Sequence, residues 1–312
     1  MLFEEFSAAL DAEVAPVYAV KGEDDYWMGL AYAKLVALCD SVDLAVYGAG
    51  DSVADALAGA ECFPFVGERR VVVLQDFAFE EGDKKRLTEY IASPPPTTVL
   101  VLYRCSWAPK GAIVCEFDRL KPYAVEKWIA SRCAKEGFRI DSAACHLLVE
   151  YCDSDAARCD AELQKLKAYA DGSISAQHVR EAVVPNDNYQ VYAFGDKVSR
   201  GDYVGAMRVL DSLIGTASDY PTFLGLLINH YRMAYYRKIS ALSDEQLGKV
   251  LGGKKAFAVK KAGETARHYT PTALYRLLQS LYQAEYDFKS GRITPEQALQ
   301  TALVQAIERR TN

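Results

Sequence analysis

The first third of the chain alternates short apolar runs with amphipathic stretches. The runs are VYAV at 17–20, LAVYG at 44–48, RVVVLQ at 70–75 and TTVLVLY at 97–103. They are nearly continuous in apolar residues, as expected of strands buried on both faces of a parallel sheet. The stretches 25–39, 52–62 and 83–91 between them have helical spacing. Strands that alternate with helices predict a doubly wound α/β domain.

The strand pattern ends after about residue 120, and the remaining chain has the spacing of helices. Three helices and a short fourth are expected before the run Pro185–Asn188, which has the composition of a hinge. From there to the C-terminus all the apolar spacing is helical. An α/β domain followed by two all-α domains is therefore predicted, with bounds at 1–121, 122–184 and 185–312.

Capping signals mark three helix starts in the last of these domains. Ser243 and Thr294 each precede a glutamine by three residues, which is the spacing of a capping box. Thr270 is followed by proline, so a capping residue precedes proline at the first helical position. Helices are expected to begin directly after these three residues.

Composition adds few constraints. Of 312 residues, half are apolar and a quarter are charged, which is ordinary for a soluble protein of two or three domains. No run approaches the roughly 18 apolar residues that a membrane span needs. The first residues, MLFEEFSAALDAE, are acidic where a secretory signal would be basic. We predict a cytoplasmic protein that does not bind membranes.

Charge is unevenly distributed along the chain. Residues 1–184 carry 19 Lys and Arg against 30 Asp and Glu, whereas residues 185–312 carry 17 against 12. The acidic first part argues against a protein that coats DNA by itself, since neutralising phosphates needs a basic face. One dense basic cluster stands out, and it is a candidate contact for DNA phosphates or an acidic partner. A solvated turn between helices is the alternative. Its residues are Lys254, Lys255, Lys260, Lys261, Arg267 and His268.

The eight cysteines and four histidines do not form a recognisable site. No CxxC pair is present, so neither a zinc site nor a disulfide framework is expected, and buried free thiols are predicted. The histidines lie in helical patterns without a neighbouring nucleophile motif, which predicts surface or packing roles. No catalytic residue, metal ligand or cofactor site is assigned.

The first strand–helix turn is where α/β domains of this type often bind a nucleotide. Here it reads Lys21-Gly22-Glu23-Asp24-Asp25-Tyr26. A phosphate-binding loop needs several glycines, followed by Lys and Ser or Thr. One glycine and three consecutive carboxylates would instead repel a triphosphate, while negative charge suits the start of a helix. The turn is predicted not to bind nucleotide.

An aromatic segment precedes the third strand. It reads Phe63-Pro64-Phe65-Val66 and is followed by charged residues. Proline ends the preceding helix and fixes a turn that can present both rings outward as anchors for a pocket on a partner. The alternative is that both rings cover the core of the sheet, and the local sequence does not separate the two.

The order of short segments along the whole chain resembles a known family. The segments are VYAVKGEDDYW, FPFVGERRVVVLQDF, TTVLVLY, CEFDRLKPYAVEKWI, AELQKLKAYADGSISAQHVREAV, VYAFGDKVSRGDYVGAMRVLDSLI and DFKSGRITPEQAL. In this order they resemble the delta subunit of the bacterial DNA polymerase III clamp loader. Each segment alone has little specificity, whereas their succession is specific.

The resemblance implies an AAA+ or RecA-like parallel sheet with a degenerate phosphate loop, then a helical lid and a helical collar. It implies partners as well: the beta sliding clamp, the gamma/tau ATPase motors, delta-prime and primed DNA in the assembled complex. In the family, hydrophobic residues before the third strand enter a pocket on the clamp. That segment corresponds here to Phe63, Pro64, Phe65 and Val66, with Phe65 the firmest match. The family most often has leucine before that phenylalanine, whereas this chain has proline.

Ser131-Arg132-Cys133 matches the arginine-finger motif of sister subunits, but it falls within a predicted helix and is interpreted as coincidence. We expect a subunit without intrinsic catalysis that binds and opens the clamp in a bacterial, nucleoid-associated replisome. The alternatives are a divergent AAA+ ATPase and an AAA+-like DNA-binding adaptor.

Overall fold

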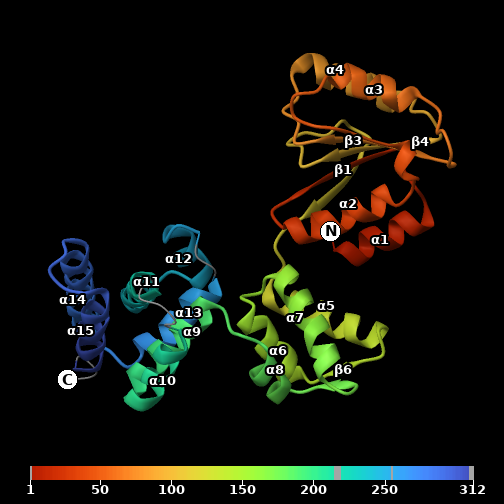
Figure 1. The fold of residues 1–312 in the computed structure, drawn as a ribbon. Helices are drawn as coiled ribbons and strands as arrows, with labels where there is room; N and C mark the ends of the chain where they lie inside the picture. The colour runs from red at the N-terminus through yellow and green to blue at the C-terminus, as the bar shows by residue number, and fades with distance from the viewer. Residues whose placement is uncertain (1, 214–218, 254–255, 309–312) are drawn as a thin grey trace. The chain divides into compact units, whose positions relative to one another are not determined.

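The computed structural model describes residues 2–213, 219–253 and 256–308 (Figure 1). The chain divides into two compact units, Met1–Ala124 and Val125–Asn312. The first unit is α/β and the second is almost entirely helical. The predicted fold class, a parallel-sheet α/β region followed by helices, is confirmed.

A five-stranded parallel sheet forms the centre of the first unit, with strand order β2-β3-β4-β1-β5. The strands are β1 (Val17–Gly22), β2 (Leu44–Tyr47), β3 (Arg70–Gln75), β4 (Thr98–Tyr103) and β5 (Ile113–Phe117). In the register, Leu100 of β4 lies opposite both Val17 and Val72. Every side chain of β4 is buried, which explains its continuous apolar sequence.

Helices cover both faces of this sheet, with α1 and α2 on one face and α3 and α4 on the other (Figure 1). Their bounds are α1 (Phe3–Ala12), α2 (Asp25–Val36), α3 (Val53–Glu61) and α4 (Glu81–Ala92), with the short 3-10 helix η1 (Ser41–Asp43) before β2. Val72, Leu74, Leu100 and Leu102 form a core with apolar residues of α3 and α4. The four predicted strands and three predicted helices of this part are therefore confirmed.

Two elements of the first unit, α1 and β5, lack a clear sequence pattern. Strand β5 lies at the sheet edge beside β1, where Ile113 and Val114 are exposed while Cys115 and Phe117 are buried. An edge strand with mixed burial has neither a continuous nor an alternating pattern. In α1, only Phe6 and Leu10 are buried, so its apolar face is too narrow to identify it.

The second unit consists of helices and one pair of very short strands. The helices are α5 (Pro122–Lys135), α6 (Ser142–Tyr151), α7 (Ala156–Tyr169), α8 (Ala176–Ala182), α9 (Asp187–Arg200), α10 (Tyr203–Leu213), α11 (Asp219–Ile239), α12 (Asp244–Val250), α13 (Ala256–Ala266), α14 (Pro271–Lys289) and α15 (Pro295–Glu308). The strands β6 (Arg139–Ile140) and β7 (Ser173–Ile174) pair in parallel. The sequence did not predict this pair, because two residues are too few to form a pattern.

The predicted caps are present at the three helix starts. The hydroxyl of Ser243 accepts from the backbone N–H of Gln246 at 3.2 Å, and Thr294 does the same for Gln297 at 3.2 Å. The glutamine side chains accept the reciprocal backbone bonds. Thr270 accepts from Ala273 at 3.1 Å. The capping signals therefore located the starts of α12, α14 and α15 correctly.

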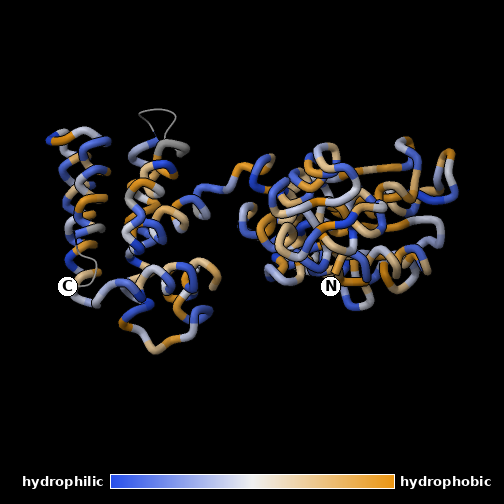
Figure 2. The backbone as a smooth tube through the Cα atoms, turned by 90° about the horizontal axis from the view of Figure 1, so that it is seen from below, coloured by the Kyte–Doolittle hydropathy of each residue, from blue (hydrophilic) through white to orange (hydrophobic). Residues whose placement is uncertain are grey.

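Buried residues of α9 to α15 form a separate apolar core in the second unit, which includes Phe194, Tyr231 and Leu277. Along the helices, hydrophobic and hydrophilic residues alternate rather than forming a long apolar segment (Figure 2). Among the described residues, no helix has the length and apolar character to cross a membrane.

Candidate functional site

The segment between α3 and β3, here called the Phe63–Val66 loop, is strongly exposed and apolar. Phe63 is 83% exposed and Phe65 is 85% exposed, more than any other large apolar side chain among the described residues. Val66 is 63% exposed, whereas Pro64 is half-buried. The rings therefore do not cover the sheet core, which was the alternative left open by the sequence.

A buried carboxylate holds the backbone of this loop. Asp43, the last residue of η1, has no exposed area. Its Oδ1 accepts from the backbone N–H of Phe65, and its Oδ2 accepts from Val66 at 3.0 Å and Gly67 at 2.9 Å. These bonds, that of Gly67 first, hold the pKa of Asp43 below its usual value because they stabilise the ionised form.

Further contacts fix both ends of the loop. The Nε of Arg70, at the start of β3, donates to the carbonyl of Gly59 in the last turn of α3 at 2.8 Å. Gly59 packs closely against Tyr47, since a Cβ there would lie 2.7 Å from the tyrosine hydroxyl and would require that side chain to shift. Exposed apolar rings on a backbone held this firmly are suited to enter a pocket on another protein.

The turn after β1 is filled by the chain itself. The N–H groups of Glu23 and Asp24 donate to the carbonyl of Phe117 at 3.0 and 3.1 Å, and the Asp24 side chain accepts from Tyr26 at 3.1 Å. A Cβ at Gly22 would lie 2.0 Å from that same carbonyl oxygen. Three backbone donors of this turn, those of Glu23, Asp24 and Tyr26, are thus engaged within the chain.

Two charged side chains of the turn form ion pairs with residues outside it. Lys21 pairs with Glu116 at 3.3 Å, and Asp25 pairs with Arg104. The three carboxylates lie at the start of α2, where negative charge stabilises a helix.

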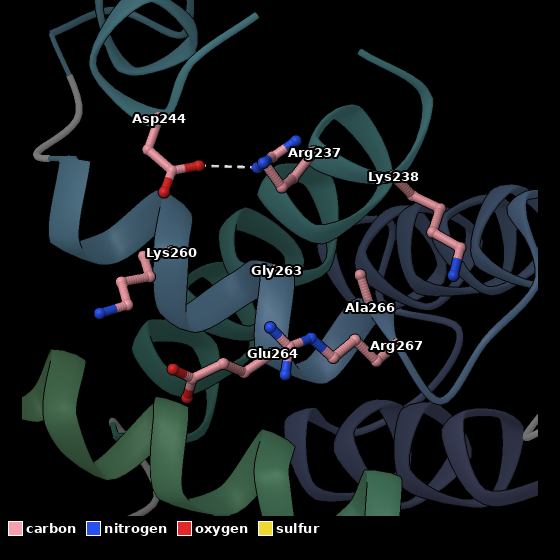
Figure 3. A pocket seen from close by; sticks show the side chains of 8 residues that line it. All are labelled: Arg237, Lys238, Asp244, Lys260, Gly263, Glu264, Ala266 and Arg267. Atoms are coloured by element: carbon pink, nitrogen blue, oxygen red, sulfur yellow. Dashed lines mark hydrogen bonds and ion pairs between the residues drawn. The ribbon is translucent and has the colours of Figure 1, made fainter. Parts of the chain in front are cut away.

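A basic cavity of about 250 Å³ lies between α11, α12 and α13 (Figure 3). Of the predicted basic cluster, Lys260 and Arg267 line it, whereas Lys254 and Lys255 lie outside the described residues. The structure adds Arg237 and Lys238 from the end of α11. These two residues were not predicted because α12 separates them from the cluster in the sequence, and only the packing of the helices brings them together.

Acidic side chains neutralise part of this cavity. Asp244 pairs with Arg237 at 2.6 Å, while Glu264 lies 3.7 Å from Lys261. Lys261 does not line the cavity: it pairs with Glu150 of α6 at 3.3 Å. Of the cationic lining residues, Lys238, Lys260 and Arg267 form no ion pair within the described parts of the chain.

The cysteines are all free thiols, but the prediction that they are buried is wrong for two. Cys62 is exposed beside the Phe63–Val66 loop, and Cys39 is half-buried. Cys62 is the C-cap residue of α3, directly after the last helical residue Glu61. Burial raises the pKa of Cys105 to about 11 and that of Cys145 to about 12, so these thiols stay protonated.

The remaining candidates carry no site chemistry. His230 is buried against Thr265, and burial lowers its pKa to about 4. Arg132 lies within α5 and pairs with Glu136 and Asp160, so it does not project as an arginine finger would. Within the described ranges, no three His, Cys, Asp or Glu side chains gather in a way that could hold a metal ion.

Comparison with known proteins gives matches over nearly the whole chain. DNA polymerase III subunit delta of Bacillus subtilis (strain 168) is 23% identical over 339 residues, covering 99% of this chain and 98% of that protein. The solved structure of the Bacillus subtilis DNA clamp loader delta protein has a TM-score of 0.75, with 22% identity over 99% of this chain and 100% of that chain. The two folds are therefore alike.

Two family models match separate parts of the chain. The model described as DNA polymerase III, delta subunit, matches residues 38–108, which include the Phe63–Val66 loop. The model described as DNA polymerase III delta subunit, C-terminal domain, matches residues 188–306, which include most of α9 to α15. Together the two models take in more than half of the chain, and the chain belongs to the family of the DNA polymerase III delta subunit.

Proposed function

We propose that this chain binds the ring-shaped beta sliding clamp through the Phe63–Val66 loop and opens the ring for loading onto primed DNA. The observation that carries the proposal is the exposure of Phe63 and Phe65, at 83% and 85%, on a backbone fixed by three hydrogen bonds to Asp43. The similar Bacillus subtilis protein is described as a clamp loader delta protein. The family and the loop geometry support the same function.

Burial of the two rings supplies the binding free energy. Transfer of one phenylalanine side chain from water into an apolar pocket contributes roughly 1.5–3 kcal/mol. Binding opens the ring only to the extent that the loop binds the opened conformation more tightly than the closed one, because a ligand shifts an equilibrium by its differential affinity. The work of opening thus comes from binding, without chemistry in this chain.

The chain has no intrinsic catalysis in this proposal. The filled turn at Lys21–Tyr26 supports it, since the N–H groups of Glu23 and Asp24 already donate to Phe117. ATP hydrolysis is assigned to the gamma/tau motor subunits, which control access to the Phe63–Val66 loop. Residues 122–184 form a lid, and residues 185–312 form a collar that assembles with the motors and delta-prime.

The basic cavity is a second contact in this proposal. Lys238, Lys260 and Arg267 supply unpaired positive charge around a space of about 250 Å³, which suits a DNA phosphate in the assembled complex. Charge reversal of Lys260 and Arg267 is expected to lower the salt dependence of DNA binding by the complex. An unchanged salt dependence would show that this cavity does not contact DNA.

Two other functions predict different measurements. A divergent AAA+ ATPase would bind ATP with micromolar affinity in the isolated chain, whereas the proposal predicts no saturable binding in that range. A DNA-binding adaptor unrelated to the clamp would not retain the clamp at all.

The most informative test is retention of the beta clamp by immobilised chain. Wild type is expected to retain the clamp and Phe65→Ala to lose it. Equal retention by the two proteins would remove the Phe63–Val66 loop from the mechanism.

A further inference from the structure

The bonds between Asp43 and the loop are directed and specific. Three backbone N–H groups, of Phe65, Val66 and Gly67, converge on two carboxylate oxygens. A carboxylate only accepts hydrogen bonds, so it satisfies three converging donors that no neutral side chain of the same shape can satisfy. Asp43 is also fully buried, so water does not substitute for it.

Asp43 links the loop to the central sheet. It directly precedes β2, which pairs with β3 from Leu44 opposite Val71 onward. The loop enters β3 one residue before Val71, at Arg70. The carboxylate therefore bridges the start of one strand to the loop that feeds its neighbour.

Without the bonds to Asp43, the loop would lower its free energy by adopting another conformation. Exposed phenylalanine rings lower their free energy by folding back onto apolar surface. Backbone N–H groups that point inward to Asp43 keep the opposite side of the loop, with its rings, toward solvent. A loop that is already ordered before it contacts the clamp loses less conformational entropy on binding.

We propose that Asp43 is a positioning residue for clamp binding, which holds the Phe63–Val66 loop in its binding conformation without touching the clamp. The inference rests on the proposed function of this loop. The apparent affinity for the clamp is proportional to the fraction of molecules whose loop has the binding conformation. Loss of Asp43 therefore weakens binding although every contacting side chain remains.

The chain offers a matched pair of variants. Asp43→Asn keeps the size of the side chain, but either orientation of its amide turns an NH2 group toward a backbone N–H. Asp40→Asn makes the same chemical change three residues earlier. Asp40 is exposed and approaches the same loop, since a Cβ at Gly67 would lie 3.4 Å from its Oδ2, yet it forms no hydrogen bond with the described loop residues.

A reporter beside the loop separates positioning from folding. Cys62 is the exposed thiol, so a spin label attached there, with half-buried Cys39 replaced by serine, reports loop motion without any clamp present. Asp43→Asn is expected to increase the mobility of this label, whereas Asp40→Asn leaves it unchanged. Far-ultraviolet circular dichroism establishes that each variant is folded. Asp43→Ala, which leaves room for water beside the three N–H groups, is measured in parallel.

The decisive experiment titrates the beta clamp against wild type, Asp43→Asn, Asp43→Ala, Asp40→Asn and Phe65→Ala. The inference predicts binding roughly tenfold weaker for both Asp43 variants and wild-type binding for Asp40→Asn. Phe65→Ala should bind roughly ten- to hundredfold more weakly. Folded Asp43 variants with wild-type affinity or unchanged label mobility would overturn the inference and leave the proposed function standing. Wild-type affinity in Phe65→Ala would instead overturn the proposed function, while label mobility would still test whether Asp43 orders the loop.

Discussion

At the scale of single residues, the sequence located the apolar groups of the candidate site but not the group that supports them. Phe63 and Phe65 stand out locally because proline separates them and charged residues follow. Asp43 lies 22 residues before Phe65, and only the pairing of β2 with β3 brings it to the loop. A contact made by tertiary pairing leaves no periodic signal in the sequence.

The two phenylalanines are expected to differ in their contributions to clamp binding. Phe65→Ala should weaken binding by roughly ten- to hundredfold, because one buried ring contributes roughly 1.5–3 kcal/mol. Phe63→Ala should have a smaller effect, since Phe65 is the firmer match to the family segment. Titration with the clamp measures both, and Val250→Ala, at a valine 71% exposed on α12, is the control. A larger loss for Phe63→Ala would reverse the assignment of the main anchor.

The buried His230 should make the folded chain less stable at mildly acidic pH. Burial lowers its pKa from 6.5 to about 4, so between these values the unfolded chain binds a proton that the folded chain does not. The free energy of unfolding should therefore fall by about 2 kcal/mol from pH 7 to pH 5 through this group. Carboxylates with lowered pKa, such as Asp43, lose their contribution only below about pH 4.

Urea unfolding at the two pH values tests this expectation. His230→Gln removes the titrating ring, so its free energy of unfolding should change less between pH 7 and pH 5 than that of wild type, whatever its stability at pH 7. Equal changes in the two proteins would show that His230 is not the group responsible.

At the scale of elements, predictions succeeded where a local rule decides the structure. The starts of α12, α14 and α15 follow from side chains that cap their own helices. Strands β1 to β4 were predictable because burial on both faces demands continuous apolar residues. Edge strand β5, helix α1 and the pair β6–β7 were missed, since few of their residues are buried or they are too short to show a period.

The capping box of α12 gives an element-scale prediction. Ser243→Ala removes the acceptor for Gln246 and should lower the free energy of unfolding by about 1 kcal/mol. Ser131→Ala makes the same change in the middle of α5, at an exposed position, and should be neutral or slightly stabilising because alanine favours helix interiors. Urea unfolding of both variants checks this pair, and equal effects would contradict the role of the cap.

At the scale of the whole molecule, the α/β-then-helical order was predictable because the pattern of apolar residues changes near residue 120. The division of charge can be read from the sequence as well, but the sequence predicted only some of the residues that line the basic cavity. Lys260 and Arg267 are close in sequence, whereas Arg237 and Lys238 join them through the packing of α11 against α13. The proposal that the clamp is the partner of the Phe63–Val66 loop rests on family resemblance, since exposed rings alone do not identify what they bind.

The central claim is that binding alone, through the Phe63–Val66 loop, biases the clamp toward an open ring. The most direct measurement is the rate at which beta clamps leave circular DNA when the isolated chain is added without nucleotide. Wild type is expected to accelerate release, and Phe65→Ala is expected to leave the rate at its unassisted value. No acceleration by folded wild-type chain at concentrations that saturate clamp binding would contradict the claim.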